Sequence, residues 1–129
     1  MKINKDIYDY CAKHSIEDDN LLNELISYTY NNKEAPNMIS GNMVGNVLYI
    51  LSKSIKAKKI LDIGMFTGYS ALKLASSIDS NGEVHTFELA ENHIKSAEKF
   101  FSKSIYKNII IHKGEALQNL EKLKSNTFD

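Results

Sequence analysis

Along the first 56 residues, apolar side chains recur every three or four positions. This spacing is typical of amphipathic helices and predicts three of them. Their apolar positions are Ile3, Ile7, Tyr10 and Cys11; Leu21, Leu22, Leu25 and Ile26; and Met43, Val44, Val47, Leu48 and Leu51. Ser15, followed by two acids, predicts the start of the second helix, and the third is predicted to end near Ser54. A polar loop around Pro36 separates these two helices.

From residue 57 onward the pattern alternates between strands and helices. Short apolar runs predict buried strands at 59–63, 83–88 and 108–112. Helical stripes follow them at Ala71, Leu72, Leu74, Ala75 and Ile78; at Ile94, Ala97, Phe100 and Phe101; and at Leu117, Leu120 and Leu123. This alternation predicts right-handed crossovers and a parallel sheet covered on both faces. We therefore predict an α/β fold: a Rossmann-like doubly wound parallel sheet, with its first three strands present, preceded by N-terminal helices.

Length and strand order predict the domain organisation. The 129 residues fit a single domain, with residues 1–56 as a helical N-terminal cap and residues 57–129 as the first half of the Rossmann-like core. In a doubly wound sheet the first strand lies at the centre. The strand at 59–63 would then lack a neighbour on one side. We expect a domain truncated at its C-terminus that associates with itself when it is expressed alone.

Composition narrows the classes of function. Lysine plus arginine count 16 and aspartate plus glutamate count 16, and this zero net charge argues against a nucleic-acid partner. The single cysteine, Cys11, indicates a reducing compartment, and no secretory leader or membrane-spanning apolar run is visible, so a cytoplasmic protein is expected. The four histidines are scattered and have no carboxylate at ligand spacing. They are predicted to be surface or strand residues and not metal ligands.

The segment from Ile60 to Ser70 carries the candidate chemistry. Asp62 ends the first strand, Gly64 and Gly68 follow it, and Ser70 lies at the start of the next helix. Gly64 has no Cβ, so the chain can turn sharply there and a ligand can approach closely. Free amides at the helix start can hold a carboxylate, and Asp62 can hold an amine. The loop therefore favours a ligand with both an ammonium and a carboxylate group.

Glu88 adds a second carboxylate at the end of the second strand. In Rossmann-like sheets an acid at this place accepts hydrogen bonds from the ribose hydroxyls of a nucleotide. Gly114, Glu115 and Ala116 follow the third strand, where the base of such a ligand would lie. The Gly-x-x-x-Gly spacing differs from the Gly-x-Gly-x-x-Gly of nicotinamide binders, and the phosphate-loop pattern is absent. A dinucleotide is therefore disfavoured.

Three stretches share their pattern with a known family. They are Met38-Ile-Ser-Gly-Asn-Met-Val-Gly45, Asp62-Ile-Gly-Met-Phe-Thr-Gly-Tyr-Ser70 and Asn81-Gly-Glu-Val-His-Thr-Phe-Glu88. Together they resemble the class I S-adenosylmethionine-dependent methyltransferases, and within these the metal-dependent O-methyltransferases of the catechol and caffeoyl-CoA type. The Gly-Tyr-Ser ending of the second stretch is the most specific part. The resemblance covers residues 38 to about 116.

The resemblance implies a site for S-adenosyl-L-methionine. Its implied cofactor-binding residues are Met38, Ser40, Asp62, Gly64, Gly68, Tyr69, Ser70, Glu88, Glu115 and Ala116. Asp62 and Ser70 would hold the methionine part and Glu88 the ribose. Asp62 stands where the family more often has glutamate, and Glu115 where many members have aspartate. For Met38 and Tyr69, packing in the core is an equally good interpretation.

The resemblance also implies an activity. This is the transfer of a methyl group to a hydroxyl of a small, catechol-like acceptor by a homodimeric enzyme that uses a divalent metal such as Mg²⁺. In the family the metal ligands and the catalytic lysine follow the helix after the third strand. No catalytic or metal-binding residue is therefore assigned in this chain, which is expected to be inactive alone. The alternative is a non-catalytic module that binds adenosine or S-adenosylmethionine and pairs with another chain.

Overall fold

The centre of the molecule is a three-stranded parallel sheet, seen in a computed structural model that describes residues 4–129. Its strands are β1 (Lys59–Ile63), β2 (Glu83–Glu88) and β3 (Ile109–Lys113), in the spatial order β1-β2-β3. Lys59 lies opposite Glu83, and Val84 lies opposite Ile109. The α/β Rossmann-like fold is therefore confirmed, with the third strand shifted by one residue from its predicted position.

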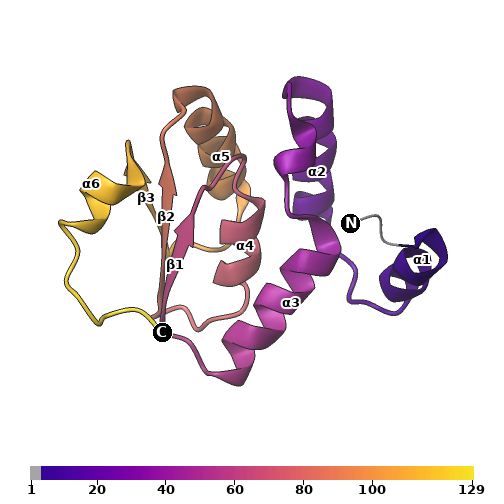
Figure 1. Ribbon diagram of the computed structural model, residues 1–129, viewed down its shortest axis with the longest axis horizontal. Helices are drawn as coiled ribbons and strands as arrows, with labels where there is room; N and C mark the ends of the chain where they lie inside the picture. The colour runs from indigo at the N-terminus through magenta and orange to yellow at the C-terminus, as the bar shows by residue number, and fades with distance from the viewer. Residues whose placement is uncertain (1–3) are drawn as a thin grey trace.

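Helices flank this sheet on both sides (Figure 1). On one face lie α4 (Tyr69–Ala75) and α5 (Glu91–Lys103), with α2 (Asn20–Asn32) and α3 (Gly41–Ser54) packed beyond them. On the other face lie α6 (Ala116–Leu120) and the C-terminal segment. In that segment the Phe128 ring packs edge-on against His85 of β2. The helices α4 and α6 are shorter than predicted, because Ile78 and Leu123 lie in the turns that follow them.

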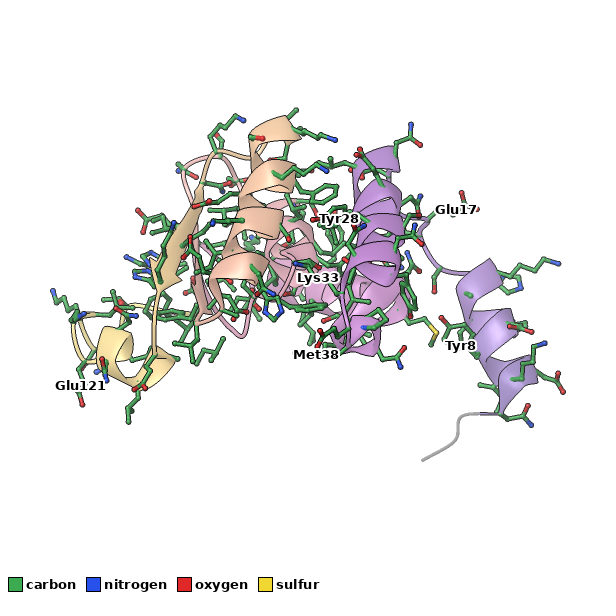
Figure 2. The ribbon with its side chains drawn as sticks, turned by 90° about the horizontal axis from the view of Figure 1, so that it is seen from above. Tyr8, Glu17, Tyr28, Lys33, Met38 and Glu121 are labelled. Atoms are coloured by element: carbon green, nitrogen blue, oxygen red, sulfur yellow. The ribbon has the colours of Figure 1, made fainter. Side chains whose placement is uncertain are left out.

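The N-terminal helix stands apart from the rest of the molecule (Figure 2). This helix, α1 (Lys5–Lys13), contacts α3 and buries none of its side chains. Ile3, which was predicted to belong to it, lies outside the described residues. Among residues 4–129 no helix combines the length and apolar character that crossing a membrane requires.

The predicted start of the second helix near Ser15 is wrong. α2 begins at Asn20, because Asp19 is its N-cap and accepts a hydrogen bond from the Leu22 amide at 2.8 Å. The Ser15 hydroxyl instead donates to the Cys11 carbonyl at 2.7 Å, at the end of α1. The polar residues between the two helices therefore form a connection and not a helical turn.

The apolar core lies between the sheet and α4. Ile60 of β1 and Val84 of β2 pack against Ala71 and Leu74 of α4. Val84 and Ala71 are completely buried. Full burial of an aliphatic side chain such as valine stabilises the fold by about 1.5–3 kcal/mol. This packing fixes the end of β1 and the start of α4, and so the loop between them.

Buried polar groups join the N-terminal helices to α4. The Asp18 carboxylate accepts hydrogen bonds from the Tyr69 hydroxyl at 2.7 Å and from Lys73 Nζ at 2.8 Å. Thr29 of α2 donates its hydroxyl hydrogen to a carbonyl of its own helix, so in its 2.9 Å contact with Thr67 it accepts. We call Asp18, Thr29, Thr67, Tyr69 and Lys73 the helical junction.

Helix α3 approaches this junction most closely at Gly45. A Cβ at that position would lie 2.8 Å from the Tyr69 hydroxyl oxygen and 3.2 Å from Cγ of Lys73. The absence of a side chain therefore lets α3 pack directly on α4.

Candidate functional site

The loop between β1 and α4 has a strained backbone. Gly64, Phe66 and Gly68 have φ angles of 91°, 52° and 96°, all in the left-handed region. A positive φ at a residue other than glycine costs of order 1–3 kcal/mol and is frequent at functional sites. The amides of Gly64 and Met65 both donate to the Phe87 carbonyl, at 3.1 and 2.9 Å. The loop is thereby tied to the end of β2.

The two glycines of the loop serve different purposes. A Cβ on Gly64 would meet nothing within 4 Å, so the space beside it is open to a ligand. A Cβ on Gly68 would lie 2.6 Å from the Phe101 ring of α5. Gly68 therefore lies at a packing contact that positions the loop, while Gly64 leaves room for close approach.

Asp62 is a half-buried residue at the carboxyl end of β1. Its Oδ2 accepts hydrogen bonds from Thr86 Oγ1 at 2.8 Å and from Ser70 Oγ at 3.2 Å. Among residues 4–129 no cationic side chain lies within ion-pair distance of it. Burial raises the pKa of Asp62, and the hydrogen bonds from Thr86 and Ser70 offset part of that rise. A partly buried acid without a counter-ion is characteristic of a binding or catalytic site.

Glu88 holds the loop from the end of β2. Its Oε2 accepts a hydrogen bond from the Phe66 amide at 2.8 Å, and its Oε1 accepts from the Leu89 and Ala90 amides, both at 2.9 Å. An ionised carboxylate offers about four acceptor positions. One position of Glu88 therefore remains for a ligand hydroxyl, in a side chain that is 11% exposed.

A small hollow collects several of the predicted residues. Its lining includes Met38, Ser40, Gly64, Tyr69 and Ser70, and its volume is about 20 Å³. Met38 is 61% exposed and so is not a core residue. Tyr69 is 1% exposed and its hydroxyl is bound to Asp18, so its side chain belongs to the core. Burial raises the pKa of Tyr69, and the hydrogen bond and charge of Asp18 raise it further.

Glu115 and Ala116 lie at the carboxyl end of β3. The Gly114 amide just before them donates to the Glu88 carbonyl at 2.9 Å, which ties this turn to β2. Glu115 occupies the N-cap position of α6, and its carboxylate accepts a hydrogen bond from Gln118 at 2.8 Å. The structure thus brings the ten predicted residues to the carboxyl edge of the sheet and to the segment before α3, but it turns the Glu115 side chain toward its own helix.

Two of the scattered histidines lie near a carboxylate in the folded chain. His85 Nδ1 lies 2.8 Å from His112 Nε2, and His85 Nε2 lies 3.1 Å from the Glu83 carboxylate. His93 Nδ1 lies 3.5 Å from the Glu88 carboxylate. His85 and His112 are strand residues, as predicted. Within the described range no three His, Cys, Asp or Glu side chains are arranged to hold a metal ion.

Sequence reasoning missed two residues of this site. Thr86 is fully buried and donates the shorter of the two hydrogen bonds to Asp62. The parallel register of β1 and β2 could have identified Thr86, because it places this residue opposite Asp62 on the neighbouring strand. Phe66 was also missed, because nothing in its residue type indicates the left-handed conformation that it adopts.

A parallel sheet with an open glycine turn and two acids at its carboxyl edge defines a protein of the Rossmann-like class, and its structural neighbours include S-adenosylmethionine-dependent methyltransferases. The chain belongs to the O-methyltransferase family, whose sequence profile matches residues 12–129.

Two relatives illustrate this membership. The chain is 28% identical over 134 residues to probable caffeoyl-CoA O-methyltransferase 1 of Dictyostelium discoideum, an alignment that covers 100% of this chain and 58% of that protein. It is 30% identical over 128 residues to catechol O-methyltransferase domain-containing protein 1 of Mus musculus, with coverage of 95% and 48%. The chain thus spans about half the length of the curated relatives it matches.

Solved structures agree with the sequence relatives. The O-methyltransferase TomG from Streptomyces achromogenes, in complex with S-adenosylmethionine, matches with a TM-score of 0.86 and 25% identity over 96% of this chain and 57% of that chain. The methyltransferase PaMTH1 from Podospora anserina, bound to S-adenosylhomocysteine, matches with a TM-score of 0.84 and 25% identity over 96% and 56%.

Proposed function

We propose that this chain is the cofactor-binding part of an enzyme that transfers the methyl group of S-adenosylmethionine to a hydroxyl of a small, catechol-like acceptor. The observation that carries the proposal is the Asp62 carboxylate, which lies half-buried near the open backbone at Gly64 and has no cationic partner among the described residues. The ammonium group of a bound methionine moiety supplies the missing positive charge. The names of the relatives support the acceptor class.

The residues around Asp62 fit that moiety. Ser70 and Thr86 both donate to Asp62 Oδ2, so they hold the carboxylate in one orientation while its other oxygen accepts from neither. The hollow of about 20 Å³ admits roughly one water-sized group. The bulk of the cofactor would therefore lie across the open carboxyl edge of the sheet, over Gly64.

The remaining predicted residues would bind the rest of the ligand. Glu88 would accept one ribose hydroxyl at its free acceptor position, while its other oxygens keep the loop in place. Ala116 and Glu115 would lie beside the adenine ring at the end of β3. Met38 and Ser40 would line the side from which the acceptor approaches. When bound, the cofactor supplies an electrophilic methyl group on its sulfonium sulfur.

The metal that the family implies does not fit the described residues. No group of three potential ligands is assembled among residues 4–129, so we derive no step through a metal ion. We assign activation of the acceptor to the portion of the relatives that this chain does not span. The 129-residue chain by itself is proposed to bind the cofactor without turnover.

Location and assembly are part of the same proposal. We propose a cytoplasmic location and a homodimer; the free cysteine Cys11, which indicates reducing conditions, supports the location. Zero net charge disfavours a nucleic-acid partner. Size-exclusion chromatography with light scattering would test the dimer.

Calorimetric titration tests the cofactor assignment. We expect S-adenosylhomocysteine to bind, and adenosine to bind more weakly because it lacks the ammonium group that Asp62 takes. Asp62→Asn should weaken binding of S-adenosylhomocysteine but not of adenosine. Asp79→Asn, in an exposed turn, is the matched control and should change neither. Tighter binding of NAD than of S-adenosylhomocysteine would overturn the assignment.

A non-catalytic module that binds adenosine or S-adenosylmethionine and pairs with another chain is the second candidate. It would use the same cofactor-binding residues as the first candidate and differ from it only in the lack of methyl transfer. Transfer of a labelled methyl group to catechol in the presence of Mg²⁺, measured on the longest natural chain that contains this sequence, separates the two. Methyl transfer supports the enzyme, and cofactor binding without transfer supports the module.

A further inference from the structure

A second cavity lies among the N-terminal helices. Its volume is about 280 Å³, near the lower end of the range for ligand pockets. Its walls come from α2, α3, α4, the segment before α2 and the segment before β3. It shares no lining residue with the hollow beside Gly64, so it is a separate site.

Asn46, in the wall of this cavity, carries an unsatisfied acceptor. The residue is 6% exposed, and its side-chain NH₂ group donates to the Ile16 carbonyl at 2.8 Å and to Asn42 Oδ1 at 3.1 Å. Both partners are acceptors, so the orientation of the amide is fixed. Its Oδ1 is buried and has no hydrogen-bond partner in the described part of the chain. A donor on a bound molecule would satisfy it.

The charges around the cavity favour a cation. Glu17 and Asp19 contribute two carboxylates to the lining. The one ammonium group in the lining, that of Lys73, is already paired with Asp18 at 2.8 Å. Burial raises the pKa of the Tyr106 hydroxyl, and the negative charge of Asp19 raises it further. An anionic ligand would be repelled.

The rest of the lining is apolar or aromatic. Leu21, Leu22 and Leu72 offer aliphatic surface. Tyr49 and Tyr106 offer aromatic rings, whose faces attract cations. A ligand that matches this lining has an apolar body and one positively charged donor group.

We propose that this cavity is a second binding site and that it takes a small primary amine with an apolar body. The ammonium group donates to Asn46 Oδ1 and is balanced by Asp19, and the body lies against Leu22 and Leu72. The site does not depend on the proposed cofactor function, because it is built from other residues.

The test uses two probes of similar shape and opposite charge, 2-phenylethylamine and phenylacetate. Each is titrated calorimetrically into the chain saturated with S-adenosylhomocysteine, or into the chain alone if that ligand does not bind. We expect saturable binding of the amine, at least about tenfold tighter than that of the acid. Absence of saturable amine binding, or equal affinity for both probes, would overturn the proposal.

Matched variants locate the binding. Asp19→Asn removes the charge and keeps a good N-cap for α2, and it should weaken amine binding about two- to fivefold. Glu17→Gln should act in the same direction. Asp9→Asn, on the exposed surface of α1, is the control of equal charge change and should leave the affinity unaltered. If Asp19→Asn and Glu17→Gln change the affinity no more than Asp9→Asn does, the amine binds elsewhere and the proposal fails.

Discussion

In the helical junction, Asp18 accepts hydrogen bonds from the Tyr69 hydroxyl and the Lys73 ammonium group, and its side chain is only 2% exposed. At the carboxyl edge of the sheet, Asp62 accepts from two hydroxyls and has no cation near it in the described structure. The Asp18 side chain is buried and Asp62 is half-buried, but only Asp18 is neutralised by a cationic side chain in the described structure. The first therefore stabilises the fold, and the second retains the capacity to bind a cation.

The two regions are mechanically connected. The hydroxyl of Thr67, in the loop beside Asp62, donates to Thr29 of α2 at 2.9 Å, and both residues are fully buried. Tyr69 of the helical junction directly precedes Ser70, which donates to Asp62. The helical junction thus helps to position the loop beside Asp62. Variants in the junction should mainly change stability, and variants at the carboxyl edge should mainly change ligand binding.

The largest effect is expected from Asp18→Asn. The Lys73 ammonium group, 6% exposed, would lose its counter-ion while it remains buried. We expect the free energy of unfolding to fall by about 3–5 kcal/mol, measured by urea denaturation. Glu24→Gln is the control, because it breaks the exposed ion pair with Lys103 and should cost at most about 1 kcal/mol. Equal losses in the two variants would contradict the role given to the junction.

Next in size is the effect of Glu88→Ala on the binding of S-adenosylhomocysteine. The variant removes the acceptor of one ribose hydroxyl, and it also releases the Phe66 amide and with it the strained loop. A hydrogen bond to a charged group contributes about 1.5–3 kcal/mol, so affinity should fall by roughly 10- to 150-fold. Glu91→Ala, at the start of α5, should lose only about 0.3–1 kcal/mol of stability. Similar binding losses in both variants would show that Glu88 is not the ribose carboxylate.

Asp62→Asn should change stability and binding in opposite directions. Burial raises the pKa of Asp62 in the folded state, so its stabilising contribution is complete only below the unfolded pKa and is lost as pH rises through the folded pKa. At pH 7 the ionised Asp62 carboxylate therefore destabilises the folded state. Removal of its charge should stabilise the chain by about 0.5–1 kcal/mol, measured by thermal unfolding. Binding of S-adenosylhomocysteine should weaken in the variant. In the parent chain, binding should weaken as pH falls through the raised pKa. A variant less stable than its parent would indicate an unrecognised counter-charge.

Sequence patterns predicted the sheet well. The strands at 59–63 and 83–88 have the predicted bounds, because buried parallel strands produce short apolar runs with clear ends. The positions of Gly64, Asp62 and Glu88 at the carboxyl edge of the sheet followed from these strand ends, and their role in binding stays a prediction. Strand ends are local properties of the chain.

The helical junction could not be predicted in the same way. Tyr69 and Lys73 meet Asp18 across 51 and 55 positions of sequence, and nothing in their neighbours indicates that contact. Asp18 is one of the two acids after Ser15 that were interpreted as a helix start. In the structure it forms the buried ion pair with Lys73 instead. Likewise, the three backbone hydrogen bonds of Glu88 depend on the loop conformation, which side-chain types do not encode directly.

The effect of Thr29→Val on binding is expected to be the smallest of the set. The substitution keeps the shape of the side chain and removes the hydrogen bond from Thr67, so unfolding free energy should fall by about 1–3 kcal/mol in the buried site. Because Thr67 lies in the Gly64 loop, affinity for S-adenosylhomocysteine should also fall, by a few-fold. Thr29→Ser keeps the hydroxyl and should restore the affinity. If Thr29→Val loses stability without losing affinity, the two regions are not coupled through this bond.

Gly45 limits which mutations the gene that encodes this chain can accept. Every single-nucleotide change that turns a glycine codon into the codon of another amino acid introduces at least a Cβ, and at position 45 that atom would lie 2.8 Å from the Tyr69 hydroxyl oxygen. Gly41, at the start of the same helix, has nothing within 4 Å of its Cβ position, and its φ of 73° is one that asparagine and aspartate also adopt. Neutral variation is therefore open at codon 41 to a few residue types and closed at codon 45, although neither glycine touches the candidate ligand chemistry.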